Sequence, residues 1–139
     1  MIWSPRKSFG AVSLAVGATQ RVLVMGGYHG DRGFFNDVWA SDDGGVTWEL
    51  FTPSAPWSER ESFGLAALTV AAAGGGGGGS SSTPPRVLLV GGFNGDAKKS
   101  DVWASDDGGA SWGQLAVAAP FGPRSGTPPL LHPQPSLHR

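Results

Sequence analysis

Residues 37–48 read DVWASDDGGVTW, and residues 101–112 read DVWASDDGGASW. The first nine residues of the two stretches are identical. In each stretch apolar residues flank a cluster of Asp and Gly, which predicts a strand, a tight turn and a second strand. Asp side chains can accept hydrogen bonds from the backbone amides of a turn, and Gly takes a positive φ without steric penalty. A hairpin that occurs twice at long spacing indicates a repeat protein.

The repeat extends well beyond this hairpin. One unit begins at Trp3 and a second at Trp57, each with the pattern aromatic-Ser-x-Arg. We expect four strands per unit: 9–16, 22–28, 37–41 and 46–51 in the first, and 63–70, 87–93, 101–105 and 110–115 in the second. All six tryptophans fall into matched pairs: Trp3 with Trp57, Trp39 with Trp103, and Trp48 with Trp112. Such pairing favours repeated packing roles over one aromatic binding site.

The expected second and fourth strands differ in pattern. The runs 22–28 and 87–93 do not alternate with polar residues, so we expect them to be buried on both faces. Each contains a Gly-Gly pair, which suits a bend or a close approach of two backbones. In the fourth strand of the first unit, Val46, Trp48 and Leu50 share one face by the two-residue period.

Composition limits the functions that the chain can have. The 139 residues suffice for one domain with a modest core. Ten basic and eleven acidic residues nearly cancel, and no apolar run approaches a bilayer span, so we expect neither nucleic acid nor membrane as a partner. The absence of cysteine excludes disulfides, thiolate metal sites and cysteine nucleophiles, and leaves the compartment open.

Two segments depart from the repeat. Residues 74–82, six glycines followed by three serines, are expected to extend a loop between the first and second strands of the second unit. Residues 127–139 are rich in proline, which lacks the donor that a central strand needs, so we expect a disordered tail.

The units resemble the kelch repeat of β-propellers, which has about four strands, a Gly-Gly at the end of the second and a Trp in the fourth. The residues that carry this resemblance are Arg6, Gly26, Gly27, Trp39 and Trp48, and Arg60, Gly91, Gly92, Trp103 and Trp112. The turn between the third and fourth strands is similar to the Asp box, Ser-x-Asp-x-Gly-x-Thr-Trp. Its residues here are Ser41, Asp43, Gly45, Thr47 and Trp48, then Ser105, Asp107, Gly109, Ser111 and Trp112. In sialidases and other propellers, Asp boxes look like structural elements that stabilise turns.

This resemblance implies an all-β fold of two four-stranded antiparallel blades, forming an incomplete propeller. Residues 3–56 would be the first blade, 57–120 the second blade with its insertion at 74–82, and 121–126 the start of an aborted third. Propellers usually have four to eight blades. The sequence therefore predicts either a piece of a larger array or self-association of copies that completes a ring.

Candidate catalytic and metal-binding patterns all favour structural roles. The adjacent carboxylates Asp42 and Asp43 suit a turn better than a calcium site. His29 has Asn94 as its counterpart and no paired nucleophile pattern. The copper-radical centre of galactose oxidase, a relative by fold, needs a cysteine joined to a tyrosine, and the chain has no cysteine. Arg6, Arg60 and Arg124 recur at equivalent positions instead of forming the arginine cluster of sialidases. We therefore expect no catalytic residue, metal or cofactor.

The leading hypothesis is a non-catalytic module that binds another protein. In kelch propellers, the loops between the second and third strands commonly form the partner surface. Carried over, the resemblance nominates Tyr28, His29, Asp31, Arg32, Phe34, Phe35, Phe93, Asn94, Asp96, Lys98 and Lys99. Phe34 and Phe35 would be anchors if exposed, and packing back onto the blade is the alternative. Two further hypotheses are a fragment of a glycan-binding or glycan-processing propeller, and a truncated product without independent function.

Overall fold

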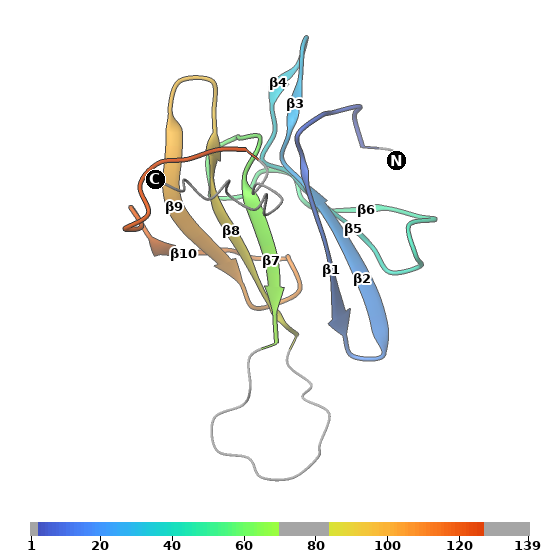
Figure 1. Cartoon of the computed structure of the whole chain (residues 1–139). Coiled ribbons are helices and arrows are strands. Elements are labelled where there is room, and N and C mark those ends of the chain that lie inside the picture. Colours follow the sequence, from blue (N-terminus) through green and yellow to red (C-terminus); the bar gives the residue numbers. More distant parts are fainter. Residues whose placement is uncertain (1–2, 70–83, 127–139) are drawn as a thin grey trace, which may run out of the picture.

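The chain folds into two four-stranded antiparallel sheets that pack against each other (Figure 1). The computed structural model describes residues 3–69 and 84–126. The loop insertion and the proline-rich tail expected from the sequence lie outside these residues. Within the described ranges, no helix has the length and apolar character needed to cross a membrane. The all-β class expected from the sequence is confirmed.

Each sheet is a simple meander, in which strands that follow one another along the chain are paired. The first sheet has the order β1-β2-β5-β6, with β1 at Gly10–Val16, β2 at Thr19–Met25, β5 at Val38–Ser41 and β6 at Glu49–Thr52. The second has the order β7-β8-β9-β10, with β7 at Gly64–Leu68, β8 at Arg86–Phe93, β9 at Lys98–Ser105 and β10 at Gly113–Ala116. A separate two-stranded hairpin, β3 (Tyr28–His29) and β4 (Gly33–Phe34), extends from the first sheet.

The fourth strand of each unit starts later than the sequence pattern predicts. Val46 and Trp48 were expected to share a strand face with Leu50, but β6 begins only at Glu49. The carboxylate of Asp43 accepts hydrogen bonds from the amides of Val46 and Thr47, so these amides are not available to a strand ladder. Val46 is consequently 80% exposed.

The Gly-Gly pairs bend the chain where two backbones meet. Gly26 and Gly27 have φ values of +61° and +100°, and their counterparts Gly91 and Gly92 have +65° and +111°. A Cβ on Gly91 would lie 2.8 Å from the carbonyl oxygen of Arg124. Both functions expected of these glycines, the bend and the close approach, are confirmed. The bend ends β2 at Met25 and separates β3 from it, whereas β8 continues through the bend to Phe93.

The main core lies between the two sheets. Leu14, Leu23 and Met25 of the first sheet and Val87 and Leu89 of the second belong to one buried cluster. The prediction that the second strands are buried on both faces holds for the end of β2, where Leu23, Val24 and Met25 are all buried. It is wrong for β8, in which burial alternates because only one face of the second sheet is covered by the first.

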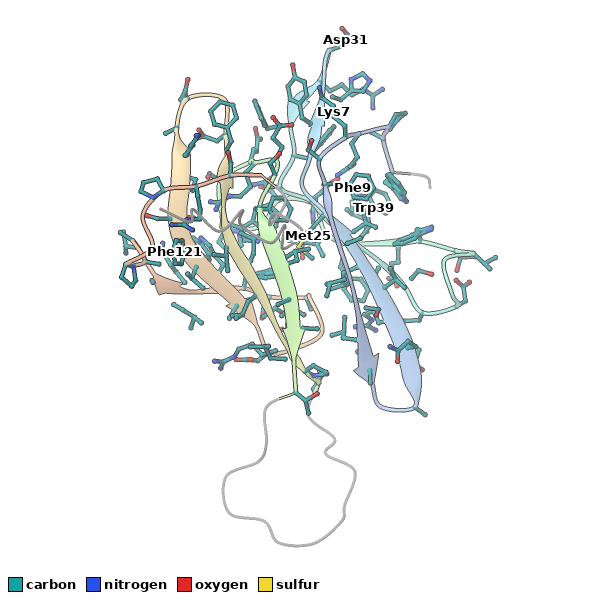
Figure 2. All side chains as sticks on the ribbon, viewed as in Figure 1. Lys7, Phe9, Met25, Asp31, Trp39 and Phe121 are labelled. Carbon is teal, nitrogen blue, oxygen red and sulfur yellow. The ribbon has the colours of Figure 1, made fainter. Side chains whose placement is uncertain are left out.

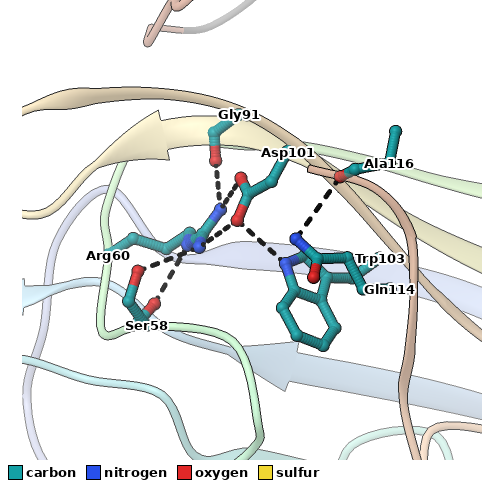
Figure 3. Close-up of polar contacts among 7 residues, drawn as sticks. All are labelled: Ser58, Arg60, Gly91, Asp101, Trp103, Gln114 and Ala116. Atoms are coloured by element: carbon teal, nitrogen blue, oxygen red, sulfur yellow. Dashed lines mark hydrogen bonds and ion pairs between the residues drawn. The ribbon is translucent and has the colours of Figure 1, made fainter. Parts of the chain in front are cut away.

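A cluster of Arg, Asp and Trp side chains occurs at the same place in each unit, and Figure 3 shows the cluster of the second unit. The guanidinium of Arg60 forms two hydrogen bonds, of 2.6 and 2.8 Å, with the carboxylate of Asp101, and a third with the carbonyl oxygen of Gly91. The indole of Trp103 donates to the same carboxylate at 2.9 Å. Arg6, Asp37 and Trp39 repeat this arrangement in the first sheet; their contacts are Arg6–Asp37, Arg6–Gly26 and Trp39–Asp37. Arg6 and Arg60 therefore have a structural role, since each ion pair joins the start of a unit to its third strand.

Candidate interaction surface

The residues nominated as a partner surface lie on two hairpins that rise side by side at one end of the molecule (Figure 1). One is the β3–β4 hairpin, which Lys7 anchors through a pair of 2.9 Å backbone hydrogen bonds with Tyr28. The other joins β8 to β9, and Glu61 anchors it through an equivalent pair with Phe93. The repeat thus places matching segments at one end of both sheets.

Two matched side chains shape the loops at the hairpin tips. The Nδ1 atom of His29 accepts a hydrogen bond from the amide of Asp31 at 3.3 Å. At the equivalent position, Oδ1 of Asn94 accepts from the amides of Asp96 and Ala97. His29 and Asn94 thus have the same role at equivalent positions, and both are turn-forming residues.

An aromatic contact joins the two hairpins. The ring of Phe34 lies 4.8 Å from that of Tyr28 on its own hairpin and 6.1 Å from that of Phe93 on the other. A Cβ added to Gly95 would lie 2.8 Å from the Phe34 ring, so only glycine permits this approach. Residues of the two units therefore form one continuous surface.

Phe35 belongs to the framework of the fold. The Arg6 guanidinium carbon lies 4.1 Å from the centre of its ring, and its carbonyl oxygen accepts a hydrogen bond from the amide of Arg60. Phe34 and Phe35 are both half-buried. Neither ring is therefore a free anchor, because each already packs against other residues of the chain.

The exposed part of the surface is polar and carries charges of both signs. Asp31 and Arg32 lie at the tip of the β3–β4 hairpin, and Asp96 and Lys98 lie at the tip of the other. Figure 2 shows Asp31 projecting at the end of its hairpin, with Lys7 below it. Lys99 is half-buried, and its carbonyl oxygen accepts a hydrogen bond from the amide of Arg124.

A shallow hollow of about 240 Å³ lies beside the β3–β4 hairpin. Its lining residues are Pro5, Arg6, Lys7, Tyr28, His29 and Gly30. The ammonium of Lys7 lies 5.5 Å from the centre of the Tyr28 ring. The sequence analysis did not nominate Lys7, although it follows Arg6, one of the residues that recur in both units.

The two Asp boxes are closed by their own side chains. Ser41 donates to Asp43 at 2.8 Å and accepts from the amide of Gly45, and the hydroxyl of Thr47 donates to Asp43 at 2.5 Å. These bonds, from Thr47 above all and also from Ser41, lower the pKa of Asp43 from 3.8 to about 2. Ser105, Asp107, Gly109 and Ser111 form the same set of bonds in the second unit.

The neighbouring carboxylates are also occupied. Arg21 forms a two-pronged ion pair with Asp42, and Arg86 forms one with Asp106. Each of these hydrogen bonds holds the pKa of the aspartate below its ordinary value. Among the described residues, no group of three or more His, Asp or Glu side chains is placed to hold a metal ion. The acidic pairs thus serve turns and ion pairs.

A scan against protein-family models and a search of curated proteins both find no match for this chain.

Proposed function

We propose that this chain is a non-catalytic interaction module of the kelch-propeller type, and that it binds an extended segment of another protein at its paired hairpins. The observation that carries the proposal is the contact of Phe34 with Phe93 and Gly95. It joins hairpins from two repeat units into one surface with exposed charges at both tips.

The blade-like arrangement supports the propeller part of the proposal. Each unit forms a four-stranded meander, and the two sheets pack face to face through β1 and β7. The same Arg–Asp–Trp cluster and the same Asp box recur in both. Sheets built alike and stacked in this way suit the blades of a propeller.

The chemistry of the surface indicates the kind of partner. Asp31, Arg32, Asp96 and Lys98 offer both signs of charge at the rim, and the hollow beside Tyr28 offers an aromatic wall next to the Lys7 ammonium. A peptide with an acidic residue beside an apolar one would satisfy Lys7 and cover the Tyr28 ring. Charged rim residues set the orientation and rate of association more than they set affinity.

The experiment is a selection of random peptides displayed on phage against the full-length chain. Selected peptides should contain an acidic residue, and in NMR titrations they should shift the amide resonances of Lys7, Tyr28 and Asp31. Lys7→Glu should weaken binding about tenfold or more, because the charge at the hollow is reversed. Glu49→Lys is the matched control, since Glu49 is exposed on β6 in the other part of the sheet.

Two results would overturn the proposal. One is that no peptide is enriched, and the other is that selected peptides bind without perturbing either hairpin. A glycan array screened in parallel tests the glycan-binding hypothesis, and selective binding there, with no peptide enriched, would replace the proposed function.

A further inference from the structure

The two repeat units pack together through opposite faces of their sheets. On the first sheet, the face directed at the second carries Leu14, Leu23 and Met25; we call this the leading face. On the second sheet, the face directed at the first carries Leu65, Val87 and Leu89; we call this the trailing face. The registers show that the two faces are different. Met25 pairs with Val38 as Val90 pairs with Val102, so Val90, and not Leu89, is the counterpart of Met25.

Each sheet therefore has one face that the other sheet does not cover, and the equivalent face of the other sheet lies in the contact between the units. The leading face of the second sheet includes Leu68, which is 44% exposed, whereas its counterpart Leu14 is 2% exposed. Leu115 of this face is 55% exposed, whereas its counterpart Phe51 packs against the core. On the trailing face of the first sheet, Phe9 is 39% exposed and its counterpart Phe63 is 8% exposed.

The Asp boxes show the same complementarity. In the second unit Gly109 packs so closely on Leu23 that an added Cβ would lie 2.7 Å from that side chain. In the first unit Gly44 has open space around it, and the Cβ position of Gly45 meets only the Trp48 ring of its own box. Leu88, the counterpart of Leu23, lies half-buried on the leading face of the second sheet.

The two units also differ in one polar contact. Besides its ion pair with Asp42, Arg21 uses Nη1 to donate to the carbonyl oxygen of Gly108 in the other unit, at 3.4 Å. Arg86 forms the equivalent pair with Asp106 through Nε and Nη2, and its Nη1 has no acceptor among the residues that the structure describes. Its counterpart acceptor is the carbonyl oxygen of Gly44, on the exposed box of the first unit.

We propose that the leading face of the second sheet binds the trailing face of the first sheet of another copy of this chain. The interface between the two units is the template. It places Leu88 of one copy against Gly45 of the next, and Arg86 against the carbonyl oxygen of Gly44. Such a contact joins two different surfaces, so it builds either closed rings or open chains that keep one free surface at each end. It uses the sheet faces, whereas the proposed peptide surface uses the hairpins.

One segment competes with the docking copy. The carbonyl oxygen of Arg124 accepts from the amide of Gly92, as that of Arg60 accepts from Gly27 at the junction between the units. A copy docked by the same geometry would bring its own Arg6 to this place. Residues 121–126 must therefore move aside, and loosening them should strengthen association.

The test uses sedimentation velocity on the full chain over a concentration series. We expect the mass to rise with concentration for the wild type. Ser13→Glu introduces a charge on the trailing face, where the counterpart Ala67 packs against the core, and Leu68→Asp does so on the leading face. Each should weaken association about tenfold or more. Ala97→Glu, at an exposed hairpin tip, is the matched control and should leave association unchanged.

Mixing the two defective variants gives the sharpest readout. The Ser13→Glu chain keeps an intact leading face and the Leu68→Asp chain keeps an intact trailing face, so together they should form a one-to-one dimer and nothing larger. Arg124→Pro removes the amide that donates to Lys99 and should strengthen association of an otherwise unchanged chain. A wild type and an Arg124→Pro variant that both stay monomeric would overturn the proposal. So would a mixture that stays monomeric while the wild type associates.

Discussion

In both Asp boxes a serine hydroxyl donates to an aspartate and accepts from a glycine amide, yet the surroundings of the two turns differ. Gly108 and Gly109 are buried against the first sheet, whereas Gly44 and Gly45 are exposed. The side chains of the turn therefore determine its shape without help from neighbours, because the same bonds form in both settings. What the neighbour decides is how much a given residue contributes to stability. Equivalent positions in the two units thus form natural pairs for experiments.

The largest difference should appear at the tryptophans that open each unit. Trp57 is fully buried between Phe63 and Trp112, whereas Trp3 is half-buried against Phe9 and Trp48. We expect Trp57→Ala to lower the free energy of unfolding by about 3–5 kcal/mol and Trp3→Ala by about 1–2 kcal/mol. Urea titrations followed by circular dichroism would measure both. Equal losses would contradict the view that contact with the other sheet sets the contribution.

Next in size is the pair of glycines inside the Asp boxes. Gly45 and Gly109 have φ values of +92° and +97°, so alanine at either position should cost about 1–2 kcal/mol in backbone strain. Only at Gly109 would the new methyl group also displace Leu23, which adds about 1–3 kcal/mol. The difference between the two variants in urea denaturation isolates the contact between the sheets. In a Leu23→Ala background, Gly109→Ala should lower the free energy of unfolding by less than it does in the wild type.

A smaller effect is expected at the arginines paired with the boxes. The Arg21 guanidinium lies 4.6 Å from the centre of the Phe51 ring and also reaches Gly108. Within residues 3–69 and 84–126, the side chain of Arg86 contacts only Asp106, in an exposed ion pair. Arg21→Ala should lower the free energy of unfolding by about 1 kcal/mol. Arg86→Ala should leave the unfolding of the monomer unchanged, as measured by urea titration at low protein concentration. A loss at Arg86 equal to that at Arg21 would show that the ion pair alone carries the effect.

The smallest effect is a pH dependence. The pKa of Asp43 falls from 3.8 to about 2 on folding, so the unfolded chain binds more protons in this range and stability declines as the pH falls from about 4 to about 2. Asp43→Asn should flatten that part of the curve of unfolding free energy against pH. Asp107→Asn should flatten it as well, because hydrogen bonds from Ser111 and Ser105 outweigh burial and hold the pKa of Asp107 low. An unaltered curve in both variants would contradict the assignment.

Much of the fold follows from the repeat in the sequence. Residues 37–48 and 101–112 predict the strand and turn that the structure shows, because Ser, Asp, Gly and Thr satisfy the turn locally. The start of β6 could not be predicted, since Val46, Trp48 and Leu50 keep the strand period while Asp43 withdraws two amides from the ladder. Burial in β8 was also missed, because matched patterns in the two units give no sign of which face each sheet presents to the other.

The candidate surface was predicted as a set of loops and not as a contact. Hairpins at equivalent places in two repeats must lie at the same end of two stacked sheets, and this common location can be predicted from the sequence. That Phe34 would pack on Phe93 and Gly95 depends on the distance between the sheets, and no local pattern encodes it. The packing of the half-buried Phe35 ring likewise depends on Arg6, which lies far away in the sequence.

The use of opposite sheet faces has a consequence for growth. Open chains of this protein would have two chemically distinct ends, one exposing Phe9 and the other exposing Leu68, so each chain would have a direction. A subunit with one defective face can still bind at one of these ends, and after binding it stops elongation there. A small fraction of the Ser13→Glu or Leu68→Asp chain would then act as an end-specific cap, and its proportion would set the mean length of the assembly.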